Sequence, residues 1–184
     1  MKNRFLGLVL SARKGNCWDF ARHVLPESDI LVLGELHLEP CSKCDYECMK
    51  DMTCPKDDDV GKIYEKWMES ENIVLFSPVY DGRPPSLYYI LEERVPSLWK
   101  RKCGGFSSFG NRNAAIVVVG NENVEMAEKV LSRSLENLGL RVIAPLSIHS
   151  NDYPAGGGIK GGLIANRELV EKLDIFKNSI LQSR

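Results

Sequence analysis

Five short apolar segments alternate along the chain with longer segments of mixed polarity. The apolar segments cover residues 5–10, 30–34, 73–76, 114–120 and 141–144. Continuous apolar runs of this length are typical of strands buried on both faces of a parallel sheet. Between them, helices are expected at 18–25, 60–68, 84–102 and 124–138, with a last helix from 166 to 180. This alternation predicts a parallel α/β sheet covered by helices on both faces.

Local signals predict where several of these helices begin and end. The acidic triplet Asp57–Asp59 is suited to cap the helix that follows it, with metal binding as the less favoured alternative. Pro84 and Pro85 suit the first turn of the next helix. Gly139 is expected to end the 124–138 helix, and Asn166 to cap the last one.

Four of the six cysteines fall in one short stretch, at Cys41, Cys44, Cys48 and Cys54, with the spacing C-x2-C-x3-C-x5-C. Such a stretch cannot form a core by itself. Four thiolates in one compact run favour an iron–sulfur cluster, and Cys54-Pro55 is similar to the end of many bacterial ferredoxin motifs. A zinc site, disulfides and an unliganded reduced loop remain alternatives. Cys103 lies far from this stretch and is interpreted as structural.

The residues after the first apolar segment, Ser11 to Trp18, have the composition of a phosphate-binding loop. Gly15 would let the backbone approach a ligand, Ser11 and Asn16 can donate hydrogen bonds, and Arg13 supplies positive charge. The helix that follows would direct its N-terminus at the anion. An ordinary strand-to-helix turn is the alternative.

A second candidate loop, Ser77 to Gly82, follows the third apolar segment. Tyr80 could stack on a planar ring or could be an ordinary half-buried loop tyrosine. In a flavodoxin-like sheet of order 2-1-3-4-5, FMN binds at the switch point between strands 1 and 3. The two candidate loops follow those strands, so we predict this fold and a ligand site at that edge.

Composition limits the functions that need to be considered. The chain has 184 residues, 43% hydrophobic and 27% charged, and a net charge of −1. We expect one domain, residues 1–184, with a cysteine-rich loop inserted at 40–56. The charge gives no general case for nucleic acid or a membrane surface, and no apolar run approaches the ~18 residues that span a bilayer.

The first ten residues superficially resemble a signal peptide, but Arg13 and Lys14 follow the short apolar run at once. We interpret this run as a buried strand and expect a reducing, cytoplasmic location, which disfavours disulfides. His23, His37 and His149 do not cluster in sequence and are not predicted to be ligands. The glycine-rich segment 154–162 cannot be assigned from its composition.

Together these motifs resemble the iron–sulfur flavoprotein branch of the NADPH-dependent FMN reductase family over roughly residues 4 to 165. Ser11 to Asn16 resembles its phosphate loop, usually Ser-Pro-Arg-Lys followed by Gly and Asn. Cys41 to Asp58 resembles its compact cysteine motif followed by paired aspartates. Ser77 to Gly82, with Arg94, resembles its Pro-x-Tyr-x-Gly flavin loop and the Asp-Arg that closes the next helix.

The sequence also departs from the family pattern. The phosphate loop is one residue short, and Cys17 stands where the family often has Thr. The second gap in the cysteine motif has three residues instead of two, and Glu93 replaces the Asp before Arg94. Many relatives keep the flavin and lack the cluster.

The resemblance implies FMN and a [4Fe–4S] cluster in a homodimer or homotetramer, with the cluster near the flavin of a neighbouring subunit. The implied FMN residues are Ser11, Arg13, Lys14, Asn16, Pro78, Val79, Tyr80, Asp81 and Gly82, and the implied cluster ligands are Cys41, Cys44, Cys48 and Cys54. No side chain is expected to act as nucleophile or general base.

The expected function is electron transfer between a one-electron carrier such as ferredoxin and a small-molecule or protein acceptor. One alternative is an NAD(P)H-dependent FMN or quinone reductase, in which the cysteines bind zinc or nothing. The other is a non-redox module whose cysteines bind zinc and form an interaction surface.

Overall fold

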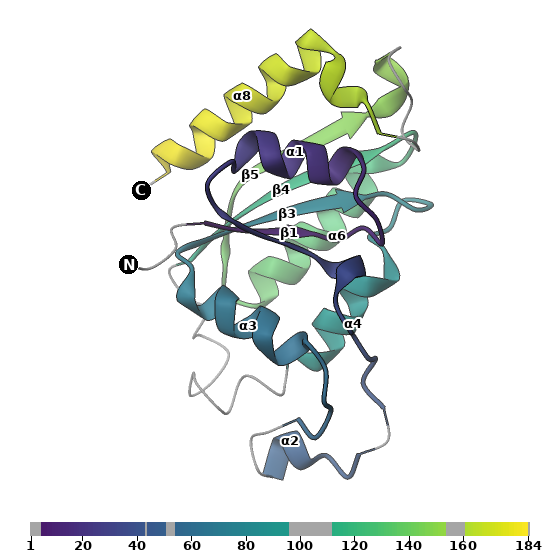
Figure 1. The fold of residues 1–184 in the computed structure, drawn as a ribbon, viewed down its shortest axis with the longest axis vertical. Helices are drawn as coiled ribbons and strands as arrows, with labels where there is room; N and C mark the ends of the chain where they lie inside the picture. The colour runs from purple at the N-terminus through teal and green to yellow at the C-terminus, as the bar shows by residue number, and fades with distance from the viewer. Residues whose placement is uncertain (1–4, 43, 51–53, 96–111, 154–160, 184) are drawn as a thin grey trace.

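A five-stranded parallel sheet forms the centre of the molecule (Figure 1). The computed structural model describes residues 5–42, 44–50, 54–95, 112–153 and 161–183. The strands are β1 (Phe5–Val9), β2 (Asp29–Val32), β3 (Asn72–Pro78), β4 (Asn113–Gly120) and β5 (Arg141–His149). All neighbouring pairs are parallel and the order is β2-β1-β3-β4-β5, which is the predicted flavodoxin-like order.

The central strands are buried on both faces, as their continuous apolar runs predict. Alternate residues of a strand point to opposite faces of the sheet. Leu6 and Leu8 of β1 therefore enter one core, while Phe5 and Val9 enter the other. β3 and β4 divide their side chains between the same two cores in the same way.

Each core is closed by its own set of helices (Figure 1). One face carries α1 (Asn16–Val24) and α8 (Arg167–Gln182). The other carries α3 (Val60–Glu69), α4 (Ser86–Arg94) and α6 (Val124–Asn137). Short segments complete the described chain: η1 (Leu33–Glu35), α2 (Glu47–Lys50), η3 (Ser150–Asp152) and η4 (Leu163–Ala165).

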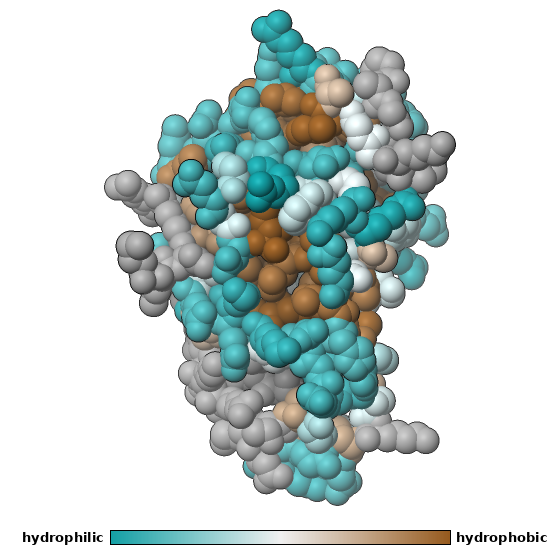
Figure 2. Space-filling model, in the orientation of Figure 1, coloured by the Kyte–Doolittle hydropathy of each residue, from teal (hydrophilic) through white to brown (hydrophobic). Residues whose placement is uncertain are grey.

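The edge strand β2 is less covered than the central strands. Ile30 and Leu31 are only half-buried there. Figure 2 shows apolar surface in the middle of the molecule in this view, between the helices that cover the two faces of the sheet. None of the described helices is long and apolar enough to cross a bilayer.

Several predicted boundaries are wrong. β5 extends to His149 instead of ending at residue 144, with a bulge opposite Ala114 and Ala115. Pro84 and Pro85 precede α4 instead of filling its first turn; Pro85 has ψ 157° and is extended. Pro84 precedes another proline and is therefore steered away from helix, and Pro85 has the extended dihedral angles that are usual for an N-cap residue. The expected helical residues 96–102 and Cys103 lie outside the described residues.

The acidic triplet caps α3 only in part. Asp59 occupies the N-cap position, but its side chain accepts a hydrogen bond from the backbone N–H of His37 at 2.9 Å. Asp58 Oδ1 accepts the N–H of Val60 at 3.3 Å, while Oδ2 accepts the N–H of Glu39 at 2.9 Å. The aspartates thus bind the backbone just before the cysteine-rich loop 40–56, called the cysteine segment below, and hold it against the start of α3.

Candidate functional site

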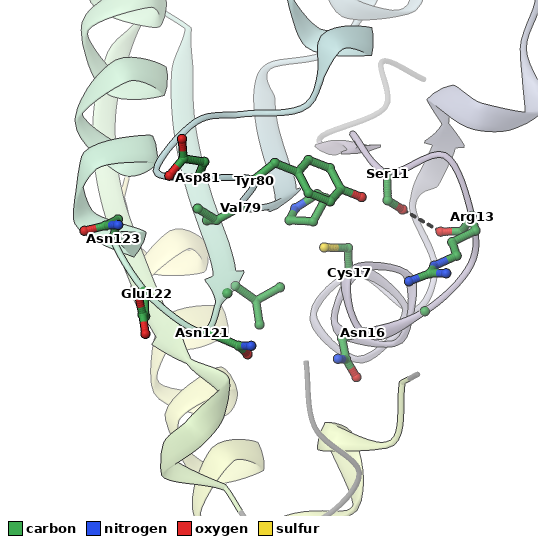
Figure 3. Close-up of a pocket in the computed structure, with 14 residues that line it drawn as sticks. Ser11, Arg13, Asn16, Cys17, Val79, Tyr80, Asp81, Asn121, Glu122 and Asn123 are labelled. Carbon is green, nitrogen blue, oxygen red and sulfur yellow. Dashed lines mark hydrogen bonds between the residues drawn. The ribbon is translucent and has the colours of Figure 1, made fainter. Parts of the chain in front are cut away.

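A pocket of about 560 Å³ lies at the carboxyl ends of β1, β3 and β4. This volume is within the range of about 300–1,000 Å³ that is usual for small-molecule and cofactor sites. Three loops line it, each following one of these strands (Figure 3). The lining residues are Ser11, Arg13, Gly15, Asn16, Cys17, Pro78, Val79, Tyr80, Asp81, Val119, Gly120, Asn121, Glu122 and Asn123.

The first wall of the pocket is the loop that the sequence predicts for phosphate binding. The Ser11 hydroxyl donates to the carbonyl of Arg13 and closes the loop on itself. Arg13 is exposed and lines the pocket. A Cβ added at Gly15 would have no heavy atom within 4 Å. The loop thus leaves open space beside its backbone, just before the N-terminus of α1.

Two residues predicted for this loop have positions that the sequence does not indicate. Asn16 lines the pocket, but its amide oxygen accepts the backbone N–H of Leu163 at 3.2 Å and fixes the start of η4. Lys14 is not among the lining residues; its ammonium lies 2.7 Å from Glu35 and 4.8 Å from the centre of the Trp18 ring. Direct binding by Lys14 is therefore not favoured by its position.

The second wall is a tight turn in the predicted ring-binding loop. Tyr80 and Arg83 exchange two backbone hydrogen bonds, at 2.9 and 3.0 Å. Asp81 and Gly82 between them have φ of 49° and 72°. Positive φ at both central positions defines a type I′ turn, for which Asp-Gly is a preferred sequence. The Tyr80 side chain is 57% exposed and borders the pocket, so one ring face is accessible to a planar ligand (Figure 3).

Gly82 supports this turn from outside the pocket lining. A Cβ at this position would lie 3.2 Å from Cβ of Asn123 and 3.3 Å from Sδ of Met126. The turn therefore packs closely against the start of α6, which holds Tyr80 and Asp81 in place at the edge of the pocket.

The third wall, residues 119–123, was not among the predicted site residues. It follows β4, which pairs with β3, so the rule that ligands bind at the carboxyl ends of parallel strands could have identified it. Gly120 is required here, because a Cβ would lie 2.8 Å from Cβ of Val79. The side chain of Asn121 accepts a hydrogen bond from the Ser150 hydroxyl, which fixes this loop to the end of β5.

Cys17 is a further lining residue that was not predicted. Its side chain is buried, and burial raises the pKa of the thiol to about 12. The thiol is therefore protonated at neutral pH and is neither a thiolate ligand nor an activated nucleophile. Its position makes it a neutral, weakly polar part of the pocket wall.

The four clustered cysteines belong to a different part of the molecule. Cys41 is exposed, and Cys44, Cys48 and Cys54 are half-buried. The pKa of Cys48 is raised, mainly by burial and to a smaller extent by the nearby thiols of the other three cysteines. Within the described ranges, however, no three His, Cys, Asp or Glu side chains are arranged as a metal site. The thiols are near one another without forming a closed ligand set, and residues 43 and 51–53 between them are not described.

The last turn of α4 holds both ends of the cysteine segment. Arg94 binds the Asp58 carboxylate, and these two side chains are only 3% and 1% exposed. Arg94 Nη1 also donates to the carbonyl of Glu39 at 2.8 Å, and Nη2 lies 3.2 Å from Sγ of Cys54. Glu93, which departs from the family pattern, accepts the backbone N–H of Cys41.

The three histidines lie apart, each beside a different carboxylate. His23 contacts Asp174 at 2.8 Å, His37 contacts Glu39 at 3.6 Å, and His149 contacts Glu125 at 2.6 Å. Hydrogen bonding to Glu125 raises the pKa of His149.

Comparison with known proteins places these features in context. An iron-sulfur flavoprotein of Archaeoglobus fulgidus is 26% identical over 110 residues, covering 60% of this chain and 54% of that protein. An iron-sulfur flavoprotein of Methanosarcina thermophila is 30% identical over 128 residues, 65% of each chain. The matches span between about half and two thirds of these relatives.

Among solved structures, RosB with a bound 8-demethyl-8-formylriboflavin-5'-phosphate intermediate superposes with a TM-score of 0.71. The superposition covers 96% of this chain and 75% of RosB, and the two sequences are 18% identical. This likeness concerns the fold alone. The sequence also matches the family described as NADPH-dependent FMN reductase over residues 4–152. This match covers most of the chain, including all three walls of the pocket. The chain therefore belongs to the NADPH-dependent FMN reductase family.

Proposed function

We propose that this protein is an electron-transfer flavoprotein that holds FMN in the pocket and a [4Fe–4S] cluster on the cysteine segment. It would pass electrons between a one-electron carrier, such as a ferredoxin-like protein, and a small-molecule or protein acceptor. The observation that carries this proposal is the meeting of the loops after β1 and β3 in one pocket, with four cysteines on a separate segment.

The pocket suits FMN in its chemistry. Arg13 and the start of α1 provide positive charge and backbone N–H groups for a phosphate. The open space beside Gly15 allows a phosphate to approach the backbone. Tyr80, Val79 and Pro78 offer an apolar wall with an exposed aromatic ring for the isoalloxazine. The family match supports the same cofactor.

The cysteine segment suits an iron–sulfur cluster in its donor set. Cys41, Cys44, Cys48 and Cys54 supply four sulfur ligands, and the thiols lie near enough to affect the pKa of Cys48. Arg94 adds a buried positive charge beside Cys54, which suits a site that accumulates thiolates. The names of the archaeal relatives support the same assignment.

FMN can accept electrons singly or in pairs, and a [4Fe–4S] cluster carries one at a time. The chain's own contribution is to keep the two binding regions apart and to shape each of them. Figure 1 shows α2, within the cysteine segment, set apart from the helices that pack on the sheet. We therefore extend the proposal to a homodimer or homotetramer, in which this segment reaches the pocket of a neighbouring subunit. Light scattering after size exclusion measures the subunit number; a monomer would contradict this extension.

The first experiment is the visible spectrum of protein purified without oxygen, together with its iron and flavin content. Flavin bands over a broad cluster absorption, with about four irons per chain, are expected. Flavin without iron would contradict the cluster, and neither flavin nor iron would contradict the proposal as a whole.

A variant of the cysteine segment separates the two cofactors. Cys44→Ala is expected to lose most of its iron and sulfide while keeping FMN, because Cys44 does not line the pocket. Ser42→Ala in the same segment is the matched control and should keep both. A full iron and sulfide content in Cys44→Ala would rule out the ligand assignment.

A second candidate function is an NAD(P)H-dependent FMN or quinone reductase that lacks the cluster. The description of the matched family, NADPH-dependent FMN reductase, supports this alternative. Stopped-flow reduction of the flavin with NADPH and with a reduced ferredoxin distinguishes the two. Rapid reduction by NADPH in iron-free protein would favour the reductase, and rapid reduction by ferredoxin alone would favour electron transfer.

A further inference from the structure

Arg94, in the last turn of α4, is a buried charge in contact with the cysteine segment. We propose that Arg94 is a positioning residue of the cysteine site: it holds Cys54 through its sulfur and raises the reduction potential of the cluster bound there. This inference rests on the proposed function, because it assumes that Cys54 is a cluster ligand.

Arg94 makes hydrogen bonds at both ends of the cysteine segment. Its Nη1 donates to the Glu39 carbonyl at 2.8 Å, just before Cys41. Its Nη2 donates to Oδ1 of Asp58 at 3.0 Å and to Sγ of Cys54 at 3.2 Å. One guanidinium therefore joins Glu39 to Cys54 and Asp58, which follow it by 15 and 19 residues in the sequence. Its rigid, planar fork of donors is suited to this, whereas a lysine ammonium is not.

Asp58 completes the arrangement and fixes the direction of the fork. It is 1% exposed, binds Arg94, and accepts the backbone N–H of Glu39 at 2.9 Å. Burial opposes ionisation of Asp58, but hydrogen bonds led by Arg94 hold the pKa of its carboxyl below the usual value. Arg94 and Asp58 therefore remain an ion pair, and Cys54 receives the remaining donor of Nη2.

A hydrogen bond to a ligand sulfur and a nearby positive charge both stabilise the more negative, reduced form of an iron–sulfur cluster. In this site both effects come from the same side chain. Asp58 has the opposite charge, and it accepts a hydrogen bond from the same Nη2 that contacts Sγ of Cys54, so its carboxylate should lower the potential. The two partners of one ion pair thus have opposite effects on the cluster, which a purely structural role would not produce.

The test is an anaerobic redox titration of the intact protein, with the cluster followed by electron paramagnetic resonance and FMN by its visible bands. Arg94→Lys and Arg94→Gln are expected to shift the cluster midpoint to more negative values. Asp58→Asn is expected to shift it to more positive values. The FMN midpoint should stay at its wild-type value, because neither residue lines the pocket.

Arg112→Lys is the matched control for replacing a partly buried arginine. Arg112 donates to the carbonyls of Ser70 and Met68, at 3.0 and 2.8 Å, away from the cysteine segment. The Arg112→Lys variant should leave the cluster and FMN midpoints unchanged. If Arg94→Gln loses iron because Asp58 is left buried without its counter-ion, the double variant Arg94→Gln/Asp58→Asn removes that charge. Its cluster midpoint should then lie below that of Asp58→Asn alone.

Two results would overturn the inference while the proposed function stands. Wild-type protein with its full iron content, but with unchanged cluster midpoints in the Arg94 variants, would show that Arg94 does not tune the site. A shift of the same sign in the Arg94 and Asp58 variants would indicate general disturbance of the loop. If wild-type protein holds FMN but no iron under anaerobic conditions, the cluster proposal fails, and the inference fails with it.

Discussion

Gly34 lies against the backbone of Ala12 so closely that a Cβ atom on residue 34 would stand 2.4 Å from the Ala12 carbonyl carbon and oxygen. The N–H of Gly34 also donates to the carbonyl of Ser11 at 3.3 Å. The atoms in the way are backbone, so no side-chain rotation can relieve the clash. The position of the loop that forms the first wall of the pocket therefore depends on the absence of a side chain at residue 34.

We predict that Gly34→Ala displaces this loop and weakens FMN binding about tenfold or more, equivalent to about 1.4 kcal/mol. Overpacking should also lower the free energy of unfolding by about 1–3 kcal/mol. Fluorescence titration of FMN-free protein and urea denaturation measure the two effects. Gly61→Ala is the control: a Cβ on this exposed α3 residue meets no atom within 4 Å. Equal FMN affinity in the two variants would contradict the prediction.

The role of Arg13 can be tested with two flavins that differ by one phosphate. Arg13→Ala should weaken FMN about 10- to 100-fold, the effect of losing a hydrogen bond to a charged group, and should leave riboflavin affinity nearly unchanged. Arg22→Ala, an exposed α1 arginine outside the pocket lining, is the control and should change neither. If Arg13→Ala weakens both flavins equally, Arg13 does not contact the phosphate.

Local signals predicted the parallel sheet, and the two candidate loops after the first and third strands predicted its flavodoxin-like order. The apolar runs identify the strands, and the helices between them require parallel connections. The predicted cap is also confirmed, since Asn166 Oδ1 accepts the N–H of Leu169 at 3.2 Å. Two of the three pocket loops were found because they follow strands and carry polar, glycine-containing sequences.

Other features depend on contacts that no local pattern contains. The fifth strand was predicted to cover residues 141–144, yet β5 continues through Pro145 to His149, because proline is tolerated on an edge strand. Arg94 and Asp58 are 36 residues apart, and their pairing depends on how α4 packs beside the start of α3. The loop after β4 was missed because Asn121, Glu122 and Asn123 read as an ordinary polar turn.

The type I′ turn provides a test of the second pocket wall. Asp81 has φ of 49°, which Asn also tolerates but which a β-branched residue strongly disfavours. We predict that Asp81→Val lowers the free energy of unfolding by about 1–2 kcal/mol and weakens FMN binding, because Tyr80 loses its fixed position. Asp81→Asn should retain both properties. Urea denaturation and FMN titration of the two variants measure stability and affinity. If Asp81→Val binds FMN as tightly as Asp81→Asn, the prediction is wrong.

The buried thiol of Cys17 predicts a specific dependence of stability on pH. Its pKa is raised by burial from the ordinary value of 9.0 to about 12. Below pH 9 the thiol is protonated in both folded and unfolded chains, so its burial costs nothing in ionisation. Between pH 9 and about 12 only the unfolded chain releases the proton, so folding loses up to about 1.4 kcal/mol per pH unit from this group. The stability is thus present below pH 9 and lost as the pH rises toward the folded pKa.

Urea denaturation in reductant at pH 8 and pH 10 measures this loss as the difference between wild-type protein and Cys17→Ala. Both proteins contain the same remaining cysteines, tyrosines and lysines, so their titration largely cancels in the difference. The difference should shift by about 1 kcal/mol in favour of Cys17→Ala as the pH rises. Cys17→Ser, which also lacks the thiol, should show the same pH response, whatever its effect on packing. A difference that stays constant from pH 8 to pH 10 would mean that the Cys17 thiol ionises as readily in the folded chain as in the unfolded one, and that the pocket wall is open to solvent at this residue.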